Sequence, residues 1–210
     1  MNRSTGAAGD GVIESAGAGH KFLRGNRVMR AYGPAHASAA TGTVSDRVFL
    51  DTLVGAAARR LVIGVDVAAA KYFSGQRIDD HVREQEILDS MAGKLKSAEH
   101  RHGLGIEFFR DQIKANKVIQ QGLHRYWDEH PEEFPSRHRH LKAELRPQLD
   151  LVNSHLLLVV TRLENMPPVR RSHIDSLFDR KLRTSAALRQ LGKLRRDATE
   201  IALRSLYRAL

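Results

Sequence analysis

The sequence has no cysteine among its 210 residues, so it can form neither a disulfide nor a thiolate metal site. Aromatic residues make up only 6% of the chain, and no apolar run is long enough to span a membrane. No segment shows the alternation of polar and apolar residues that a half-buried strand requires. These absences argue against a disulfide-stabilised or membrane-spanning protein, and they favour an all-α fold.

Acidic residues are scarce relative to basic ones, which gives a formal net charge of +10. Lysine and arginine outnumber aspartate and glutamate by 5 to 2 in residues 1–45 and by 11 to 4 in residues 165–210, whereas residues 46–164 carry 18 of each. Basic ends are typical of nucleic-acid-binding proteins, but no aromatic residues alternate with these cations. We therefore predict no nucleic-acid partner and keep a basic helical nucleic-acid-binding protein as an alternative. Arg195 and Arg196 are expected on the surface.

Composition also divides the chain into three regions. Residues 1–44 are rich in glycine, alanine and serine without sustained periodicity, which indicates a disordered or processed leader. Residues 35–39 have the small side chains of a signal-peptidase site, but the stretch before them is cationic and not apolar. Residues 45–165 are expected to form the main helical domain, and residues 166–210 a helical extension packed on it.

Apolar residues at helical spacing predict six amphipathic helices, over residues 45–74, 79–102, 106–127, 141–163, 172–191 and 193–210. Gly75 is expected to end the first helix, and Asp79 or Asp80 to cap the second. Gly103 is expected to end the second helix, and Pro147 lies near the start of the fourth. The predicted architecture is a helical bundle with extra C-terminal helices.

Charged and amide side chains recur at helical spacing within this bundle. Arg60 and Lys71 are eleven residues apart, close to three turns, so they face the same side of one helix, about 16 Å apart along its axis. Asn116 and Gln120 are four residues apart and form a polar face on an otherwise apolar helix. Arg146 lies near the start of the predicted fourth helix. If the helices pack as a bundle, these groups converge in its interior and could hold a small anion.

The sequence around these residues resembles the all-helical (AroQ-class) chorismate mutases, in particular the exported, periplasmic gamma subclass. The resemblance covers residues 46–164 and rests on motifs with matched spacing, namely ARRL (58–61), AAAKY (68–72), IDDHVRE (78–84), FRDQIKANKVIQ (109–120) and LRPQLDLVN (145–153). The ending SLYRAL (205–210) is similar to the tail helices of that subclass. The resemblance implies rearrangement of chorismate to prephenate in phenylalanine and tyrosine biosynthesis.

The resemblance also implies which residues act on the substrate. Arg60 and Arg146 would bind its carboxylates, and Lys71 would contact a carboxylate and the ether oxygen. Gln120 would donate a hydrogen bond to the same oxygen from the other side, and Asn116 would support a carboxylate.

The remaining implied roles belong to the start of the second helix. Asp80 and Glu84 would position the ring hydroxyl, and Arg83 would bridge these groups. The whole site then holds four cations and two carboxylates, a balance of +2 that suits a dianion such as chorismate. The rearrangement is intramolecular, so it requires a compact substrate conformer and stabilised charge on the ether oxygen, and no cofactor.

Partners and location follow from the resemblance as well. It implies a free small-molecule substrate, a homodimer, and a periplasmic or secreted location, with a cytoplasmic location as the alternative. His138 and His140 lie in a charged loop without a further ligand at zinc-like spacing, so no metal site is expected. A catalytically inactive homologue that only binds the ligand is a second alternative.

Overall fold

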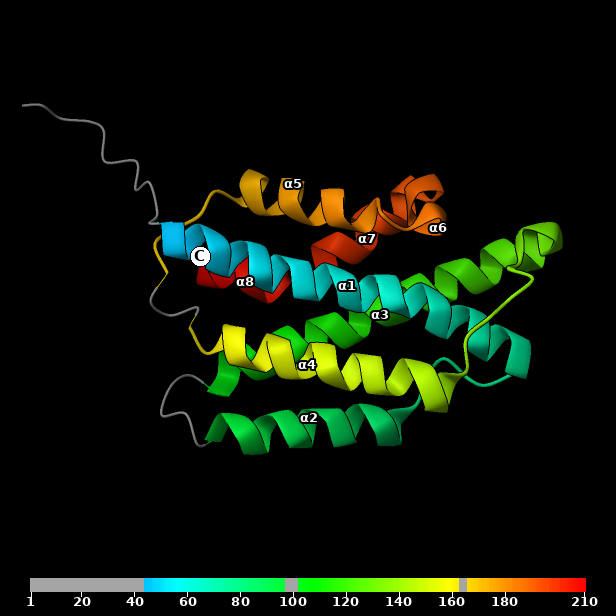
Figure 1. Cartoon of the computed structure of the whole chain (residues 1–210), viewed down its shortest axis with the longest axis horizontal. Helices are drawn as coiled ribbons and strands as arrows, with labels where there is room; N and C mark the ends of the chain where they lie inside the picture. Colours follow the sequence, from blue (N-terminus) through cyan, green and yellow to red (C-terminus); the bar gives the residue numbers. More distant parts are fainter. Residues whose placement is uncertain (1–43, 97–101, 163–165) are drawn as a thin grey trace, which may run out of the picture. The chain divides into compact units, whose positions relative to one another are not determined.

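The computed structural model describes residues 44–96, 102–162 and 166–210, and this part of the chain contains helices and no strand (Figure 1). The α-helices are α1 (Val44–Ser74), α2 (His81–Lys96), α3 (His102–Glu129), α4 (Arg146–Val160), α5 (Arg171–Leu182), α6 (Ala186–Gln190), α7 (Gly192–Ala202) and α8 (Arg204–Ala209). A 3₁₀ turn, η1 (Pro131–Glu133), and a π-helical turn, η2 (Leu141–Leu145), precede α4. The all-α prediction is confirmed. The predicted leader lies outside the described residues, apart from Val44.

Helix α1 is a central element of the bundle. It contacts α3, α4 and α5, while α2 packs on α3 (Figure 1). Much of its buried face is alanine, which lets neighbouring helices approach closely, and the larger core side chains come from residues such as Leu53, Leu61, Phe108, Phe109 and Phe178. Burial of this apolar surface is the main favourable contribution to folding. α1 therefore has a fixed rotation within the bundle, which decides where its two polar residues point.

The turn after α1 forms as predicted. Gly75 has a φ of 65°, which is the left-handed conformation that glycine adopts most easily. Gln76 donates its backbone N–H to the carbonyl of Lys71 (3.0 Å), which closes the end of the helix. Asp80 caps α2, because its Oδ1 accepts the backbone N–H of Arg83 (3.1 Å). Asp80, which the sequence analysis assigned to the substrate site, is thus also the N-cap of α2.

The predicted boundary at Gly103 is wrong. Gly103 lies in the first turn of α3, which begins at His102 and not near residue 106. Glycine ends a helix where the backbone turns left-handed, and among the described glycines Gly75 alone does so. Helix α2 is described as far as Lys96. The predicted continuation over residues 97–101 lies outside the described residues.

The fourth predicted helix begins with a π-helical turn. Leu145 donates its backbone N–H to the carbonyl of His140 (3.2 Å), five residues back. Pro147 then occupies the first turn of α4, where its missing N–H is not needed. The prediction that Pro147 lies near a helix start is confirmed. Helix α4 ends at Val160, and residues 163–165 lie outside the described part of the chain.

Each of the two predicted C-terminal helices is split. Ser185 accepts the backbone N–H of Leu188 (3.5 Å) and starts α6. The break between α7 and α8 is fixed from α3, since Asp111 accepts the backbone N–H of Ser205 (3.1 Å) and Gln112 Nε2 donates to the carbonyl of Ala202 (2.9 Å). Helix α5 packs on α1, and α7 and α8 pack on α3.

The expectation that Arg195 is a surface residue is wrong, whereas Arg196 is exposed. Arg195 is only 5% exposed. Its guanidinium pairs with Asp179 on α5 (2.6 Å) and donates to the carbonyl of Leu188 (2.7 Å). The rotation of α7 turns Arg195 toward α5, and neighbouring cations in a sequence do not share a helix face.

Candidate active site

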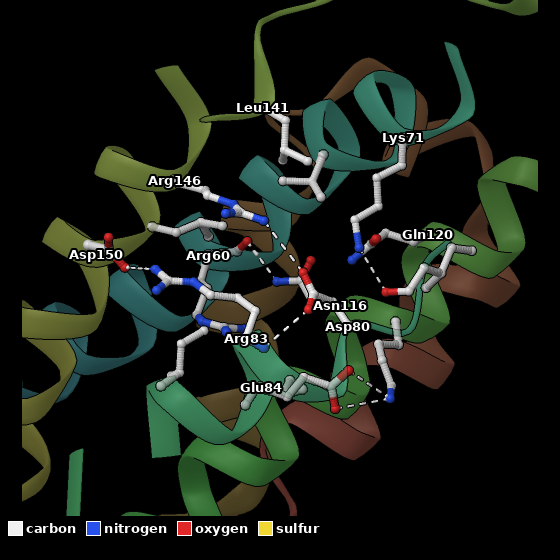
Figure 2. A pocket seen from close by; sticks show the side chains of 16 residues that line it. Arg60, Lys71, Asp80, Arg83, Glu84, Asn116, Gln120, Leu141, Arg146 and Asp150 are labelled. Atoms are coloured by element: carbon white, nitrogen blue, oxygen red, sulfur yellow. Dashed lines mark hydrogen bonds and ion pairs between the residues drawn. The ribbon is translucent and has the colours of Figure 1, made fainter. Parts of the chain in front are cut away.

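One pocket between α1, α3, α4 and the start of α2 brings together all eight side chains singled out from the sequence (Figure 2). They are Arg60 and Lys71 from α1, Asp80, Arg83 and Glu84 from the start of α2, Asn116 and Gln120 from α3, and Arg146 from α4. Apolar side chains complete the lining, namely Val67, Ile78, Ile87, Ile113, Leu141 and Leu149. A polar ligand with an apolar ring face would match this mixture.

Arg60 is buried in the pocket wall and is held by neutral acceptors. Its side chain is 4% exposed, Nε donates to Oδ1 of Asn153 on α4 (2.9 Å), and Nη1 donates to the backbone carbonyl of Gln112 on α3 (2.8 Å). Within the described part of the chain, no carboxylate pairs with it. Burial lowers the pKa of Arg60 to about 10, because a guanidinium removed from water loses its hydration. At neutral pH it is a buried, uncompensated cation.

Among the cations that line the pocket, Lys71 is the second without a carboxylate partner in the described structure. It is 8% exposed, and its Nζ donates to the backbone carbonyl of Ile78 (2.8 Å). Burial lowers the pKa of Lys71, although the charges of Asp80 and Glu84 act in the opposite direction. The ammonium group can donate two further hydrogen bonds.

Gln120 points toward Lys71 (Figure 2). Its side chain is 6% exposed, and its buried Oε1 has no hydrogen-bond partner among the described residues. A buried amide oxygen without a partner costs free energy, so such an atom in a pocket commonly accepts a hydrogen bond from a ligand. The side-chain amide of Gln120 lines the same pocket as Lys71 and can donate through its Nε2 or accept through its Oε1.

Asn116 fits closely against α1. Its Nδ2 donates to the backbone carbonyl of Arg60 (3.1 Å), and it is 7% exposed. Gly64 provides the room, because a Cβ at this position would lie 1.9 Å from Oδ1 of Asn116. This contact fixes the distance between α1 and α3 at the pocket.

The other two predicted arginines have carboxylate partners. Arg146 lies 3.4 Å from Asp80. Arg83 pairs with Asp150 on α4 (2.7 Å) and with Glu86 (3.2 Å). Figure 2 shows the pair of Arg146 with Asp80 and the pair of Arg83 with Asp150, both of which join the start of α2 to α4. All of these side chains are partly exposed, so each pair contributes little to stability and mainly sets geometry.

Three residues of the site were not predicted from the sequence, namely Lys117, Asp150 and Asn153. Lys117 pairs with Asp79 (2.8 Å) and Glu84 (3.0 Å), which ties α3 to the start of α2. These pairs raise the pKa of Lys117 even though burial opposes the shift. Asp150 follows Arg146 by one helical turn, and that spacing could have indicated it. The role of Asn153 depends on a contact between α1 and α4, for which the sequence offers no signal.

The pocket carries the net charge that the sequence predicted. The lining includes five cations and three carboxylates, so the balance of +2 is unchanged by the unpredicted pair of Lys117 and Asp150. The paired groups are Arg83, Arg146 and Lys117. The uncompensated charge belongs to Arg60 and Lys71, both held by neutral oxygen atoms. The pocket is therefore electrostatically suited to a dianion.

Curated proteins with related sequences identify the family of this chain. A secreted chorismate mutase from Mycolicibacterium smegmatis is 31% identical over 166 residues, which cover 79% of this chain and 90% of that protein. A secreted chorismate mutase from Mycobacterium tuberculosis is 28% identical over 151 residues, which cover 65% of this chain and 75% of that protein. No family model matches the chain. The chain belongs to the chorismate mutase family, so the resemblance predicted from its motifs is confirmed.

Solved structures confirm the fold. The chorismate mutase of Burkholderia thailandensis matches with a TM-score of 0.60 and 26% identity, covering 75% of this chain and 98% of that one. The chorismate mutase of Burkholderia phymatum matches with a TM-score of 0.63 and 22% identity, covering 77% and 97%. Within the described residues, no helix is long and apolar enough to cross a membrane.

Proposed function

We propose that this chain is an isomerase that converts chorismate to prephenate in the pocket between α1, α2, α3 and α4. The observation that carries this proposal is the pair of buried cations, Arg60 and Lys71, that lack a carboxylate partner in the described structure. Leaving two such charges uncompensated is costly in a protein that binds nothing. A dianionic substrate provides the missing negative charge.

The reaction requires little chemistry from the protein. Chorismate rearranges within one molecule, so no nucleophile or cofactor takes part. The enzyme selects the compact conformer in which the reacting carbons approach each other. It also stabilises the negative charge that develops on the ether oxygen as the carbon–oxygen bond breaks.

The positions of the polar groups suggest how they share this task. Arg60 and Arg146 bind the substrate carboxylates, and Asn116 supports one of them. Lys71 and Gln120 donate to the ether oxygen from opposite sides, and both residues line the pocket.

The start of α2 takes the other end of the substrate. Asp80 and Glu84 accept a hydrogen bond from the ring hydroxyl, and Arg83 bridges these groups. Their existing partners support this assignment, because Lys117 holds Glu84 and Asp150 holds Arg83.

Loss of chorismate ultraviolet absorbance with purified protein tests the proposal. Lys71→Ala is expected to lower turnover on the order of 10²–10³-fold, because it removes a donor at the breaking bond. Lys114→Ala is the matched control, since Lys114 is exposed on α3 and is expected to leave turnover unchanged. Near-normal kinetics of Lys71→Ala would refute the role of this pocket. Binding of chorismate without turnover would favour the inactive homologue.

The C-terminal extension is proposed to brace the bundle and not to bind nucleic acid. All eight predicted site residues precede residue 166, and the extension packs on α1 and α3. Several of its cations are already in ion pairs, including Arg171 with Glu200 and Lys193 with Asp197. Salt-dependent retention on DNA would contradict this assignment.

Two further statements rest on the relatives and the motif resemblance. The protein is proposed to act in the periplasm or outside the cell, because the curated relatives are named as secreted enzymes. The motif resemblance alone supports the proposal of a homodimer. Its prephenate is proposed to serve phenylalanine and tyrosine biosynthesis. Light scattering of the purified protein tests the dimer, and fractionation of the source cells tests the location.

A further inference from the structure

We propose that Asn153 is a positioning residue that holds Arg60 in place while leaving its positive charge available to the substrate. This inference rests on the proposed function. Asn153 is 1% exposed on α4, and its Oδ1 accepts from Arg60 Nε at 2.9 Å. It is the one side chain bonded to this guanidinium in the described structure, and the second acceptor is the backbone carbonyl of Gln112.

The two acceptors fix the orientation of the guanidinium and leave some of its N–H donors available. Hydrogen bonds from Nε and Nη1 fix the plane of the group, because a guanidinium is rigid and its donors point in set directions. Of its five N–H groups, these two bonds leave three. The remaining donors can grip a carboxylate in the bidentate manner that arginine favours.

The neutrality of the acceptor matters as much as its position. An aspartate has almost the same shape as an asparagine and would also accept from Nε, but it would place a negative charge beside Arg60. The substrate carboxylate would then compete with a resident one, and the net charge of +2 in the pocket would fall to +1. Amide and carbonyl oxygens orient Arg60 without this competition.

The decisive variant is therefore Asn153→Asp, which keeps the hydrogen bond and changes the charge. Folding is expected to be maintained or improved, since a buried arginine gains a partner. KM for chorismate is expected to rise at least tenfold with kcat within about threefold, because Arg60 grips a carboxylate equally in the ground and transition states. Calorimetry with chorismate is expected to show the same loss of affinity.

Two companion variants separate charge from packing. Asn153→Ala removes the hydrogen bond, so KM is expected to rise while thermal stability falls. His155→Asp adds the same charge on the exposed face of α4 and is expected to leave KM within twofold of wild type.

Each outcome decides between the hypotheses. Suppose that the unmodified enzyme is active and that Asn153→Asp has the same KM and affinity for chorismate. That result would overturn the positioning role and leave the proposed function intact. If Asn153→Asp failed to fold and lost kcat as well, Asn153 would have a purely structural role. If the wild-type protein neither turns over nor binds chorismate, the proposed function itself fails, and the role of Asn153 fails with it.

Discussion

Two arginines are buried to nearly the same extent in different parts of the molecule, Arg60 at 4% exposure and Arg195 at 5%. Arg195, in the C-terminal extension, pairs with the carboxylate of Asp179. Burial alone would raise the pKa of Asp179, but its ion pairs with Arg183 and Arg195 lower it. Arg60, in the pocket, has only an amide and a backbone carbonyl as acceptors within the described structure. A buried arginine that serves structure is neutralised, whereas one that serves a ligand is oriented and left charged.

The uncompensated charge of Arg60 opposes folding. The folded-state pKa of Arg60 lies below its unfolded value, at about 10, so the unfolded chain holds that proton more tightly. Below this pH the charged group disfavours folding, by about 3 kcal/mol for a shift of this size. The penalty decreases as the pH rises from the folded-state pKa toward the higher pKa of the unfolded chain. Ligand binding can relieve the same penalty at neutral pH, because it supplies the missing counter-charge.

The largest expected effect contrasts these two arginines directly. Arg60→Met is expected to lower kcat/KM on the order of 10³-fold, because it removes a charge-assisted carboxylate contact. Its free energy of unfolding should change by no more than about 1–2 kcal/mol, since the removed charge offsets the two acceptors that lose a donor. Steady-state kinetics and urea unfolding measure both quantities, and Arg59→Met on the exposed side of α1 is the control.

Arg195→Met should give the opposite result. It leaves buried carbonyl acceptors without a donor, so stability is expected to fall by about 1–3 kcal/mol. At a temperature where the variant is folded, kcat/KM should stay within twofold of wild type. If Arg195→Met lost activity while Arg60→Met kept it, the distinction between the two sites would be wrong.

A second prediction concerns pH. An amide donates a hydrogen bond at any pH, so wild-type kcat/KM is expected to be constant from about pH 5 to pH 8. On the alkaline side it should fall as Lys71 loses its proton, at a lower pH than for a free lysine, because burial lowers the pKa of Lys71. A wild-type rate that fell steeply between mildly acidic and neutral pH would contradict the role of Gln120.

Gln120→Glu provides the complementary measurement. A glutamate must be protonated to donate to the ether oxygen, so the variant is expected to lose activity as pH rises. At neutral pH the loss should be on the order of 10²-fold, the scale of one missing donor at the breaking bond. A flat pH–rate profile in this variant would show that residue 120 does not contact the reacting oxygen.

The sequence predicted those parts of the site that depend on spacing within one helix. Arg60 and Lys71 face the same pocket because the α-helical period carries phase reliably over three turns. The contacts of Asn153, Lys117 and Gly64 depend instead on how neighbouring helices are rotated and how closely they approach. The helix boundary at Gly103 failed for a related reason, since a glycine alone does not determine its backbone conformation.

The smallest expected effect tests one of those unpredicted contacts, the fit of Gly64 against Asn116. In Gly64→Ala, the new Cβ would lie 1.9 Å from Oδ1 of Asn116 if nothing moved. Asn116 would have to shift, and its hydrogen bond to the carbonyl of Arg60 would weaken. We expect kcat/KM to fall about tenfold and stability to fall by about 1–3 kcal/mol, as for other overpacked sites.

Gly93→Ala is the matched control, because a Cβ added to Gly93 on α2 would meet no atom of the described residues within 4 Å. Alanine there should stabilise the protein by about 0.5–1 kcal/mol through helix propensity, with unchanged kinetics. Thermal unfolding and kcat/KM of both variants then separate the effect of the close contact at Gly64 from the general effect of replacing a helical glycine by alanine. If Gly64→Ala also gained stability and kept full activity, Asn116 would be free to move, and the spacing between α1 and α3 would not be what holds the polar face of the pocket in register.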